Sequence, residues 1–294
     1  MSLVSLFKKF PTEESCIEYL EKIRFAKGRY CVYCGSKKVC NHNLIGSKTR
    51  NSNRLQCQSC HKSFSVTVNT IFHRTHLDLR HWFYIIFLML NAKKGISACQ
   101  VARDLGIRRP TVWAIMHKIR KAMATEQKEL LEGIFEMDET YIKSKNDDKD
   151  DNDLNGTGRR ENNTSVVGIK QKGGVIKAFA THNTTTTTLL NLALRVAKRG
   201  SEIHTDEYNA YTKFSEFYKH KKVKHAVEYV TADGIHCNGV ESFWALLKRG
   251  IKGQFHHLSK KYLQNYIDEF EFRYNHKTQK DLGMSEVVGR MLFV

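Results

Sequence analysis

The chain has 294 residues, of which 41% are hydrophobic and 27% charged, and its formal net charge is +18. This composition predicts a globular protein with two or more hydrophobic cores. The longest apolar run, residues 82–90, is far too short to cross a bilayer, so we expect no membrane partner. The first residues lack the apolar core of a signal peptide, so we do not expect secretion.

The positive charge is concentrated in the first half of the chain. Residues 1–130 contain 23 Lys and Arg against 8 Asp and Glu, whereas residues 131–294 contain 25 against 22. A basic front half joined to a nearly neutral back half indicates a polyanion-binding module followed by a domain with another role. We expect three domains, at residues 1–70, 71–130 and 131–294.

The first domain contains a pattern typical of a zinc site. After a short amphipathic helical segment at residues 1–27, two CxxC pairs follow, formed by Cys31, Cys34, Cys57 and Cys60. Two such pairs at this separation predict a four-cysteine zinc ribbon, with free structural thiols as the alternative. Without secretion signals, the eight cysteines indicate reduced thiols and metal binding instead of disulfides.

The second domain is expected to be helical. Residues 79–90 predict a core helix, and residues 100–115 predict two shorter helices separated by a turn at Gly106. Pro110 suits the first turn of the second helix. The alternative is an ordinary helical pair, but the surrounding positive charge favours DNA binding. The candidate DNA contacts are Arg108, Arg109, Thr111, Trp113 and Lys118.

From residue 134 the pattern is that of an α/β domain. Strict alternation in a strand at 134–142 places Glu136 and Asp138 on one face and Glu139 on the other. The other expected elements are a polar loop at 146–163, strands at 166–170 and 175–181, a helix capped within 184–188, strands at 203–205 and 222–227, and a final helix at 259–275.

Three widely separated acids are candidate metal ligands. Asp138 lies in a strand, Asp206 follows the end of another, and Glu241 lies on an amphipathic helix. Three oxygen-donor anions can hold two Mg²⁺ ions roughly 3.5–4 Å apart, which is the arrangement used in phosphoryl transfer. Lys248 lies about 10 Å further along the same helix face, where it could contact a phosphate. Asn238 is an alternative third ligand.

The segments MDETY, HTDEYNAY and NGVESFWALLKRG resemble the three signature blocks of DDE transposases of the Merlin superfamily and its bacterial insertion-sequence relatives. The resemblance covers nearly the whole chain, because those proteins also carry a zinc ribbon and a helix-turn-helix. It implies an RNase H-like mixed sheet with flanking helices and a catalytic triad of Asp138, Asp206 and Glu241. Gly239 stands where a Thr is commoner, which predicts a less firmly held start of the Glu241 helix.

The resemblance also implies an activity and its partners. Such a protein binds the terminal inverted repeats of a transposon, cleaves DNA with two Mg²⁺ or Mn²⁺ ions, and joins the ends to target DNA, with one structural Zn²⁺ in the ribbon. We expect a homodimer or higher oligomer on DNA, located in the nucleus of a eukaryote or in the cytoplasm or nucleoid of a bacterium. Two alternatives stay open: a DNA-binding regulator with an inactive catalytic domain, and an RNase H-like nuclease without strand transfer.

Overall fold

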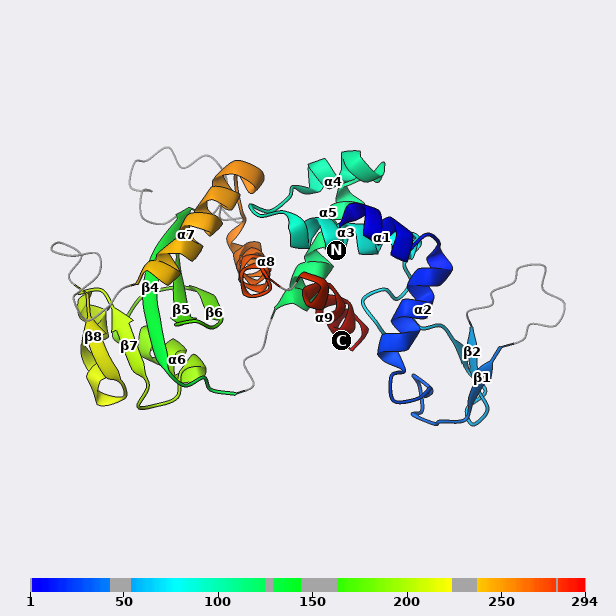
Figure 1. The fold of residues 1–294 in the computed structure, drawn as a ribbon, viewed down its shortest axis with the longest axis horizontal. Coiled ribbons are helices and arrows are strands. Elements are labelled where there is room, and N and C mark those ends of the chain that lie inside the picture. The colour runs from blue at the N-terminus through cyan, green and yellow to red at the C-terminus, as the bar shows by residue number, and fades with distance from the viewer. Residues whose placement is uncertain are drawn as a thin grey trace. The chain divides into compact units, whose positions relative to one another are not determined.

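The computed structural model describes residues 2–42, 54–124, 129–143, 163–223, 237–278 and 280–293. They form two compact units: unit 1 comprises Met1–Ala92, Ala98–Met123 and Thr278–Val294, and unit 2 comprises Lys93–Ser97 and Ala124–Lys277 (Figure 1). Nearly all of the predicted polar loop, and the end of the strand predicted at 222–227, lie outside the described residues. Among the helices described, none is both long and apolar enough to span a membrane.

Unit 1 combines a small antiparallel sheet, in the order β1-β2-β3, with helices. Its elements are α1 (Leu3–Lys9), α2 (Glu13–Arg24), β1 (Val39–Asn41), β2 (Leu55–Cys57), β3 (Ser63–Phe64), α3 (Leu79–Asn91), α4 (Ala98–Leu105), α5 (Arg109–Met123) and α9 (Lys280–Leu292). The helices α1 and α2 both begin with a capping box, led by Ser2 and Thr12. The predicted helical segment before the ribbon is therefore two separate helices.

The predicted helix pair of the second domain is present as α4 and α5. Gly106 between them has φ +66°, a left-handed conformation that favours glycine and turns the chain sharply. One side of α5 buries Val112, Met116 and Ile119, so the opposite side faces outward.

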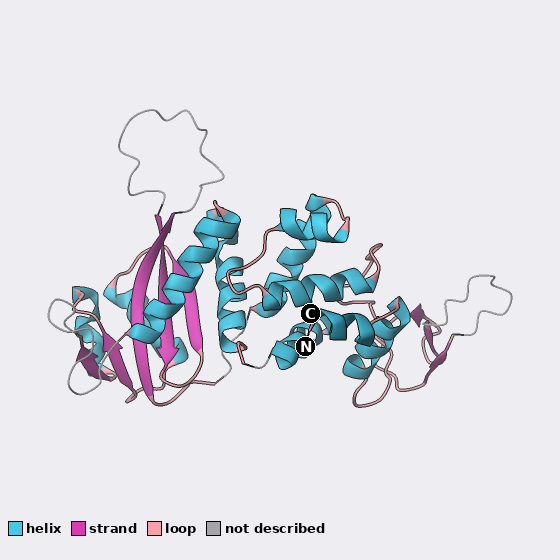
Figure 2. Cartoon of the chain, turned by 45° about the horizontal axis from the view of Figure 1, so that its top comes forward, coloured by secondary structure: helices cyan, strands magenta, loops and turns pink. Residues whose placement is uncertain are grey.

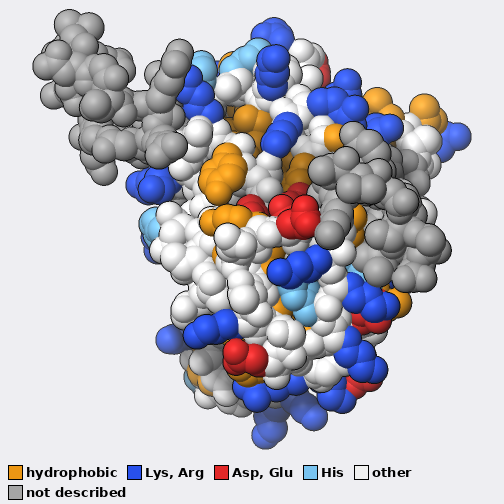
Figure 3. Space-filling model, turned by 90° about the vertical axis from the view of Figure 1, so that its left-hand side faces the viewer, with side chains coloured by type: hydrophobic (Ala, Val, Ile, Leu, Met, Phe, Trp, Pro, Cys, Tyr) orange, Lys and Arg blue, Asp and Glu red, His pale blue; other side chains and the backbone are white. Residues whose placement is uncertain are grey.

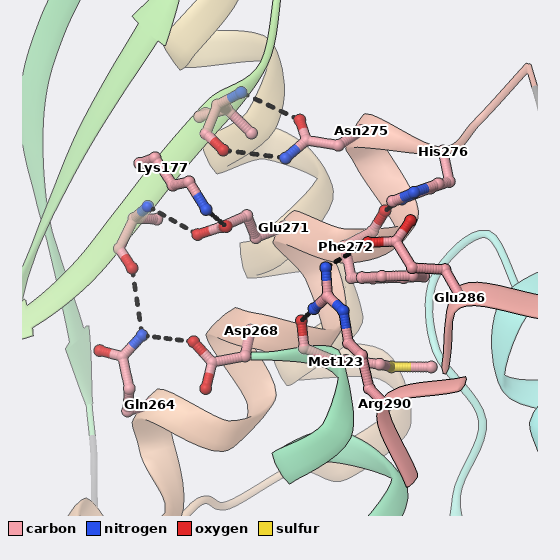
Figure 4. Close-up of polar contacts among 12 residues, drawn as sticks. Met123, Lys177, Gln264, Asp268, Glu271, Phe272, Asn275, His276, Glu286 and Arg290 are labelled. Carbon is pink, nitrogen blue, oxygen red and sulfur yellow. Dashed lines mark hydrogen bonds and ion pairs between the residues drawn. The ribbon is translucent and has the colours of Figure 1, made fainter. Parts of the chain in front are cut away.

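The C-terminal helix α9 packs against α2, α3 and α5. Its Arg290 guanidinium donates to the carbonyl oxygen of Met123 at the end of α5 at 3.2 Å (Figure 4). It also donates to the carbonyl oxygen of Ala122 at 3.4 Å. The structure thus groups residues 278–294 with the N-terminal residues, whereas we expected one domain over 131–294. The sequence pattern also gave no indication of α9.

Unit 2 is built on a five-stranded sheet with the order β6-β5-β4-β7-β8. Strand β5 pairs antiparallel with both β6 and β4, whereas β7 pairs parallel with both β4 and β8. This pattern agrees with the RNase H-like mixed sheet that we expected. The elements are β4 (Ile134–Lys143), β5 (Asn163–Gln171), β6 (Ile176–Thr181), α6 (Thr186–Val196), β7 (Glu202–Thr205), η1 (Asn209–Glu216), β8 (Lys219–Lys222), α7 (Asn238–Gly250), η2 (Ile251–Phe255), η3 (Lys260–Tyr262) and α8 (Leu263–Asn275).

Alternate residues of the central strand β4 enter two different cores, as the sequence pattern predicted. Phe135 and Met137 pack with α6 and η1 on one face of the sheet. Ile142 packs with α7 and α8 on the other face (Figure 2). Asp138 and Ile142 are an even number of residues apart on β4, so their side chains project from the same face of the sheet, the face that α7 covers.

Polar side chains of α8 hydrogen-bond the outer edge of β6 (Figure 4). They link Ile176 with Asn275 (2.9 and 3.0 Å), Ala178 with Glu271 (3.0 Å) and Ala180 with Gln264 (2.7 Å). Glu271 also forms a buried ion pair with Lys177 at 2.9 Å. These contacts give partners to backbone groups that have no neighbouring strand, and they fix α8 along β6.

Candidate active site and DNA-binding surfaces

The four predicted zinc ligands come together in unit 1. The sulfur atoms of Cys31 and Cys60 are 3.6 Å apart. Those of Cys34 and Cys57 are also 3.6 Å apart, and all four lie within 4.8 Å of one another. A tetrahedral zinc ion with Zn–S bonds of about 2.3 Å requires sulfur separations of about 3.8 Å. The cluster therefore fits a structural zinc ion.

The turns around this cluster explain why its geometry is specified locally. Gly35, directly after the first CxxC pair, has φ +74°, and its amide donates to the Cys31 carbonyl at 2.9 Å. The Tyr33 amide donates to the Cys31 sulfur at 3.4 Å. The nearby Cys40 instead donates to the Gln56 carbonyl at 3.7 Å, so it stays outside the cluster.

In unit 2, the register of two parallel strands indicates where two of the predicted acids lie. The parallel strands β4 and β7 align Glu136 with His204. Asp206 follows directly after the end of β7, so the same register continued by two residues favours a position beside Asp138, because adjacent strands lie about 4.8 Å apart. The Asp206 carboxylate accepts the amide hydrogen of Tyr208 at 3.0 Å, which orients it as the chain leaves the sheet.

The third acid, Glu241, lies exposed in the first turn of α7. This helix is held to the sheet on both sides of Glu241. The Glu136 carboxylate accepts hydrogen bonds from the amides of Gly239 (2.7 Å) and Val240 (3.1 Å). Further along, the Trp244 indole donates to Asp138 at 2.9 Å. The expectation of a loosely held helix start at Gly239 is therefore wrong, because Glu136 supplies the cap.

The three acids repel one another electrostatically. Burial, with smaller contributions from the carboxylates of Asp206 and Glu241, raises the pKa of Asp138 to about 6, against the hydrogen bonds from the Trp244 indole and the Glu139 amide. The carboxylate oxygens of Asp138, Asp206 and Glu241 do not all lie as close to one another as the four cysteine sulfur atoms do. On the face of unit 2 shown in Figure 3, acidic side chains gather near the middle with Lys and Arg around them. Concentrated negative charge on oxygen donors fits divalent cations such as Mg²⁺.

We expect divalent cations to raise the melting temperature more at about pH 7.5 than at about pH 5. Below its pKa of about 6, Asp138 carries a proton that must leave before a cation binds. The melting temperature, measured with and without Mg²⁺ across this range, tests the expectation.

The cation-free protein should show the opposite trend. Because the folded pKa of Asp138 exceeds the ordinary value of 3.8, its ionisation costs stability as pH rises from about 4 to about 6. Asp138→Asn should remove this part of both pH profiles and leave the contribution of Glu139, whose pKa is also raised. A cation effect that is equal at both pH values would contradict the assignment.

Glu139 lies on the opposite face of β4, as its parity predicted. Its carboxylate accepts a hydrogen bond from the buried Tyr211 hydroxyl at 2.5 Å. Burial, with smaller contributions from the charges of Asp206 and Asp138, raises the pKa of Glu139 to about 7, against this hydrogen bond. Since Tyr211 lies in η1, just after Asp206, the contact ties the Asp206 segment to β4.

A glycine makes room for the indole that orients Asp138. Gly168 pairs with Asp138 across β4 and β5, and a Cβ atom at Gly168 would lie 2.7 Å from the Trp244 ring. We expect Gly168→Ala to displace Trp244 and to lower the stability of unit 2 by about 1–3 kcal/mol. Chemical denaturation measures the loss. Gly173→Ala is a control for backbone strain alone, because Gly173 has φ +73° in a hairpin and a Cβ atom there would meet no other atom within 4 Å.

The remaining predicted residues of the active site are exposed. Lys248 lies in the last turn of α7 and Asn238 is its first residue, both accessible from solvent. A phosphate contact by Lys248 and metal binding by Asn238 remain predictions. The sequence analysis did not identify Glu136, Trp244 or Tyr211 as contributors to the site. The alternation along β4 places Glu136 on the same face as Asp138, and this pattern could have indicated its role.

All five predicted DNA contacts lie on the outward side of the helix pair. Their side chains are exposed in or just before α5, while the intervening apolar residues are buried. Trp113 is 40% exposed, which is unusual for so large an apolar side chain. Lys118 places its ammonium 5.8 Å from the Trp82 ring centre. The residues are Arg108, Arg109, Thr111, Trp113 and Lys118.

Comparison with known proteins places the chain among transposases. The profile of the ISXO2-like transposase domain matches residues 130–275, and that of the transposase zinc-ribbon domain matches residues 11–63. Together these matches cover more than half of the chain. It is a transposase with an N-terminal zinc ribbon, and it belongs to the ISXO2-like family.

The sequence is similar to an uncharacterized protein in transposable element ISH50 of Halobacterium salinarum. The two are 25% identical, over 90% of this chain and 92% of that protein. Solved structures that it resembles include the Mos1 mariner paired end complex with Mn (12% identity, TM-score 0.28, 69% and 73% coverage) and the Mos1 strand transfer complex (12%, 0.29, 70% and 73%). These TM-scores are too low to assign a shared fold.

Proposed function

We propose that the chain cleaves the ends of its transposable element and joins them to target DNA, using Asp138, Asp206 and Glu241 as ligands for two Mg²⁺ or Mn²⁺ ions. The observation that supports this most is the parallel register of β4 and β7, which pairs Glu136 with His204, two residues before Asp138 and Asp206 respectively. In addition, Trp244 of α7, the helix that carries Glu241, donates a hydrogen bond to Asp138. When bound, such ions activate the attacking oxygen and stabilise the leaving oxygen.

The proposed chemistry has two balanced steps. In the first, water adds across a phosphodiester bond at the transposon end and leaves a 3′-hydroxyl and a 5′-phosphate. In the second, that 3′-hydroxyl attacks a target phosphodiester. A bond forms between the transposon 3′-oxygen and phosphorus, the bond from phosphorus to the target 3′-oxygen breaks, and the target strand leaves with a 3′-hydroxyl that takes up the proton. Neither step requires a covalent enzyme intermediate.

The residues of the chain have separate parts in this scheme. Trp244 holds one oxygen of Asp138, so that the carboxylate keeps one orientation toward α7. Lys248 is exposed on the same helix as Glu241 and would bind a phosphate next to the scissile bond. Unit 1 would bind the terminal repeats through the exposed side of α5. Pairing of two ends implies a dimer or higher assembly.

Product analysis tests the proposal. Labelled DNA from the flanks of the gene, with a supercoiled target plasmid, is incubated with the protein in Mg²⁺, Mn²⁺ or Ca²⁺. We expect cleaved ends and joined products in Mg²⁺ or Mn²⁺. Binding without cleavage in any of these ions would favour a DNA-binding regulator. Cleavage without joined product would favour a nuclease that lacks strand transfer.

The helix-turn-helix assignment has its own test. Arg108→Ala combined with Arg109→Ala should weaken binding of the terminal DNA by about tenfold or more. The number of counterions released on binding, measured from the salt dependence, should fall by about two. Electrophoretic mobility shifts at several salt concentrations measure both. Arg103→Ala, an exposed arginine on α4, is the matched control; an equal loss there would contradict a specific role for the α5 start.

A further inference from the structure

Glu136 is a buried carboxylate that the proposed chemistry does not use. Its side chain lies on β4, and the residue is only 3% exposed. It accepts the amide hydrogens of Gly239 and Val240 at the start of α7. The N-cap residue of that helix, Cys237, makes no side-chain capping hydrogen bond. Glu136 therefore replaces the missing cap and places negative charge at the positive end of the helix.

The spacing of two contacts fixes α7 on the strand. Glu136 and Asp138, two residues apart on one face of β4, are separated by about 6.8 Å along it. Val240 and Trp244, their respective partners, are four residues apart, or about 6.0 Å along α7. Because the two spacings nearly match, both contacts form at once. Together they prevent α7 from sliding or rotating, and Glu241 lies between them.

The glycine in the first turn is required by the same contact. A Cβ atom at Gly239 would lie 2.6 Å from the Glu136 carboxylate and 2.8 Å from Lys170 Cδ. Any larger residue would therefore push the carboxylate away from the helix amides. The absence of a side chain at Gly239 lets strand and helix approach closely enough for Glu136 to act as a cap.

We propose that Glu136 is a positioning residue, which holds the first turn of α7 on β4 and thereby sets Glu241 beside Asp138. This inference rests on the proposed function, because it assigns Glu136 a part in the same site. Because Glu136 is buried, the proposal assigns it no contact with DNA or the reacting atoms. Its effect passes through the backbone of α7 to the carboxylate of Glu241.

The experiment compares Glu136→Ala and Glu136→Gln with a control that removes a different helix cap. Thr185→Ala is suitable, because the Thr185 hydroxyl caps α6 in the same unit through the Thr188 amide. The measurements are amide hydrogen exchange over 237–243, Mn²⁺ binding by electron paramagnetic resonance, and cleavage kinetics on labelled end DNA.

We expect Glu136→Ala to speed exchange over 237–243, to weaken Mn²⁺ binding, and to lower kcat by about 10–100-fold with little change in KM for DNA. Glu136→Gln keeps an acceptor oxygen and should restore most of the activity. Thr185→Ala should lower the melting temperature without changing Mn²⁺ binding or kcat. The contrast between Glu136→Ala and Thr185→Ala distinguishes a defect in positioning of the site from a general loss of stability.

A second variant covers the case in which Glu136→Ala does not fold. Gly239→Ala keeps Glu136 but displaces its carboxylate, so it should produce the same changes. Wild-type exchange, Mn²⁺ binding and kcat in either folded variant would overturn the inference. If the wild-type protein itself cleaves no DNA, the proposed function fails, while exchange and Mn²⁺ binding still decide whether Glu136 positions α7.

Discussion

Asp138→Asn is expected to reduce DNA cleavage by about a hundredfold or more while leaving the affinity for transposon ends nearly unchanged. Loss of groups that merely support a metal ligand costs about 10–100-fold, and loss of the ligand charge itself should cost at least as much. The amide keeps an acceptor oxygen for the Trp244 indole, so the fold of unit 2 should persist. Single-turnover cleavage and mobility shifts on the same labelled DNA measure the two effects.

The matched control for this change is Glu216→Gln, which removes an equal charge from an exposed position in η1. It should retain wild-type cleavage. Asp206→Asn and Glu241→Gln should resemble Asp138→Asn, because all three charges act on the same cations. Wild-type cleavage by Asp138→Asn protein would remove this residue from the active site and would leave a DNA-binding role as the better assignment.

Loss of the zinc ligand Cys57 is expected to unfold the ribbon and to weaken DNA binding by tenfold or more. The described part of the ribbon contains three short strands, and structural zinc supplies about 10–16 kcal/mol in comparable small sites. We expect a single zinc ion per wild-type chain by elemental analysis and none after Cys57→Ser. Hydrogen exchange should become fast over residues 31–42 and 54–64 without a change in unit 2.

Cys99→Ser is the control, since Cys99 is exposed and lies outside the cluster. It should keep both zinc and DNA affinity. Because the zinc is assigned a structural role, Cys57→Ser protein supplied at saturating DNA concentration should still cleave. If protein without zinc binds transposon ends normally, the ribbon does not contribute to their recognition as proposed.

Local patterns in the sequence predicted the parts of the site that depend on short spacings. The CxxC pairs specify their own turns, and alternation along β4 correctly separated Asp138 from Glu139. These features depend on neighbouring residues, so periodicity is sufficient to find them. The resemblance to DDE transposases then supplied the grouping of Asp138 with Asp206 and Glu241.

The features that were missed depend on contacts between distant segments. Glu136 and Gly239 are separated by 103 residues in the chain, and their contact exists only once α7 lies on β4. Considered alone, Gly239 predicts a weak helix start, whereas in the fold it permits the cap. The grouping of α9 with the N-terminal helices likewise depends on tertiary packing, which no local pattern reveals.

The contacts between α8 and β6 also bear on assembly. At residues 176, 178 and 180 the backbone amides of β6 are bonded to side chains of α8. A second copy of the chain therefore finds these donors occupied and cannot lengthen the sheet by adding a strand there. Two protomers brought together by paired DNA ends must associate through other surfaces, and aggregation by intermolecular β-pairing is blocked along this border.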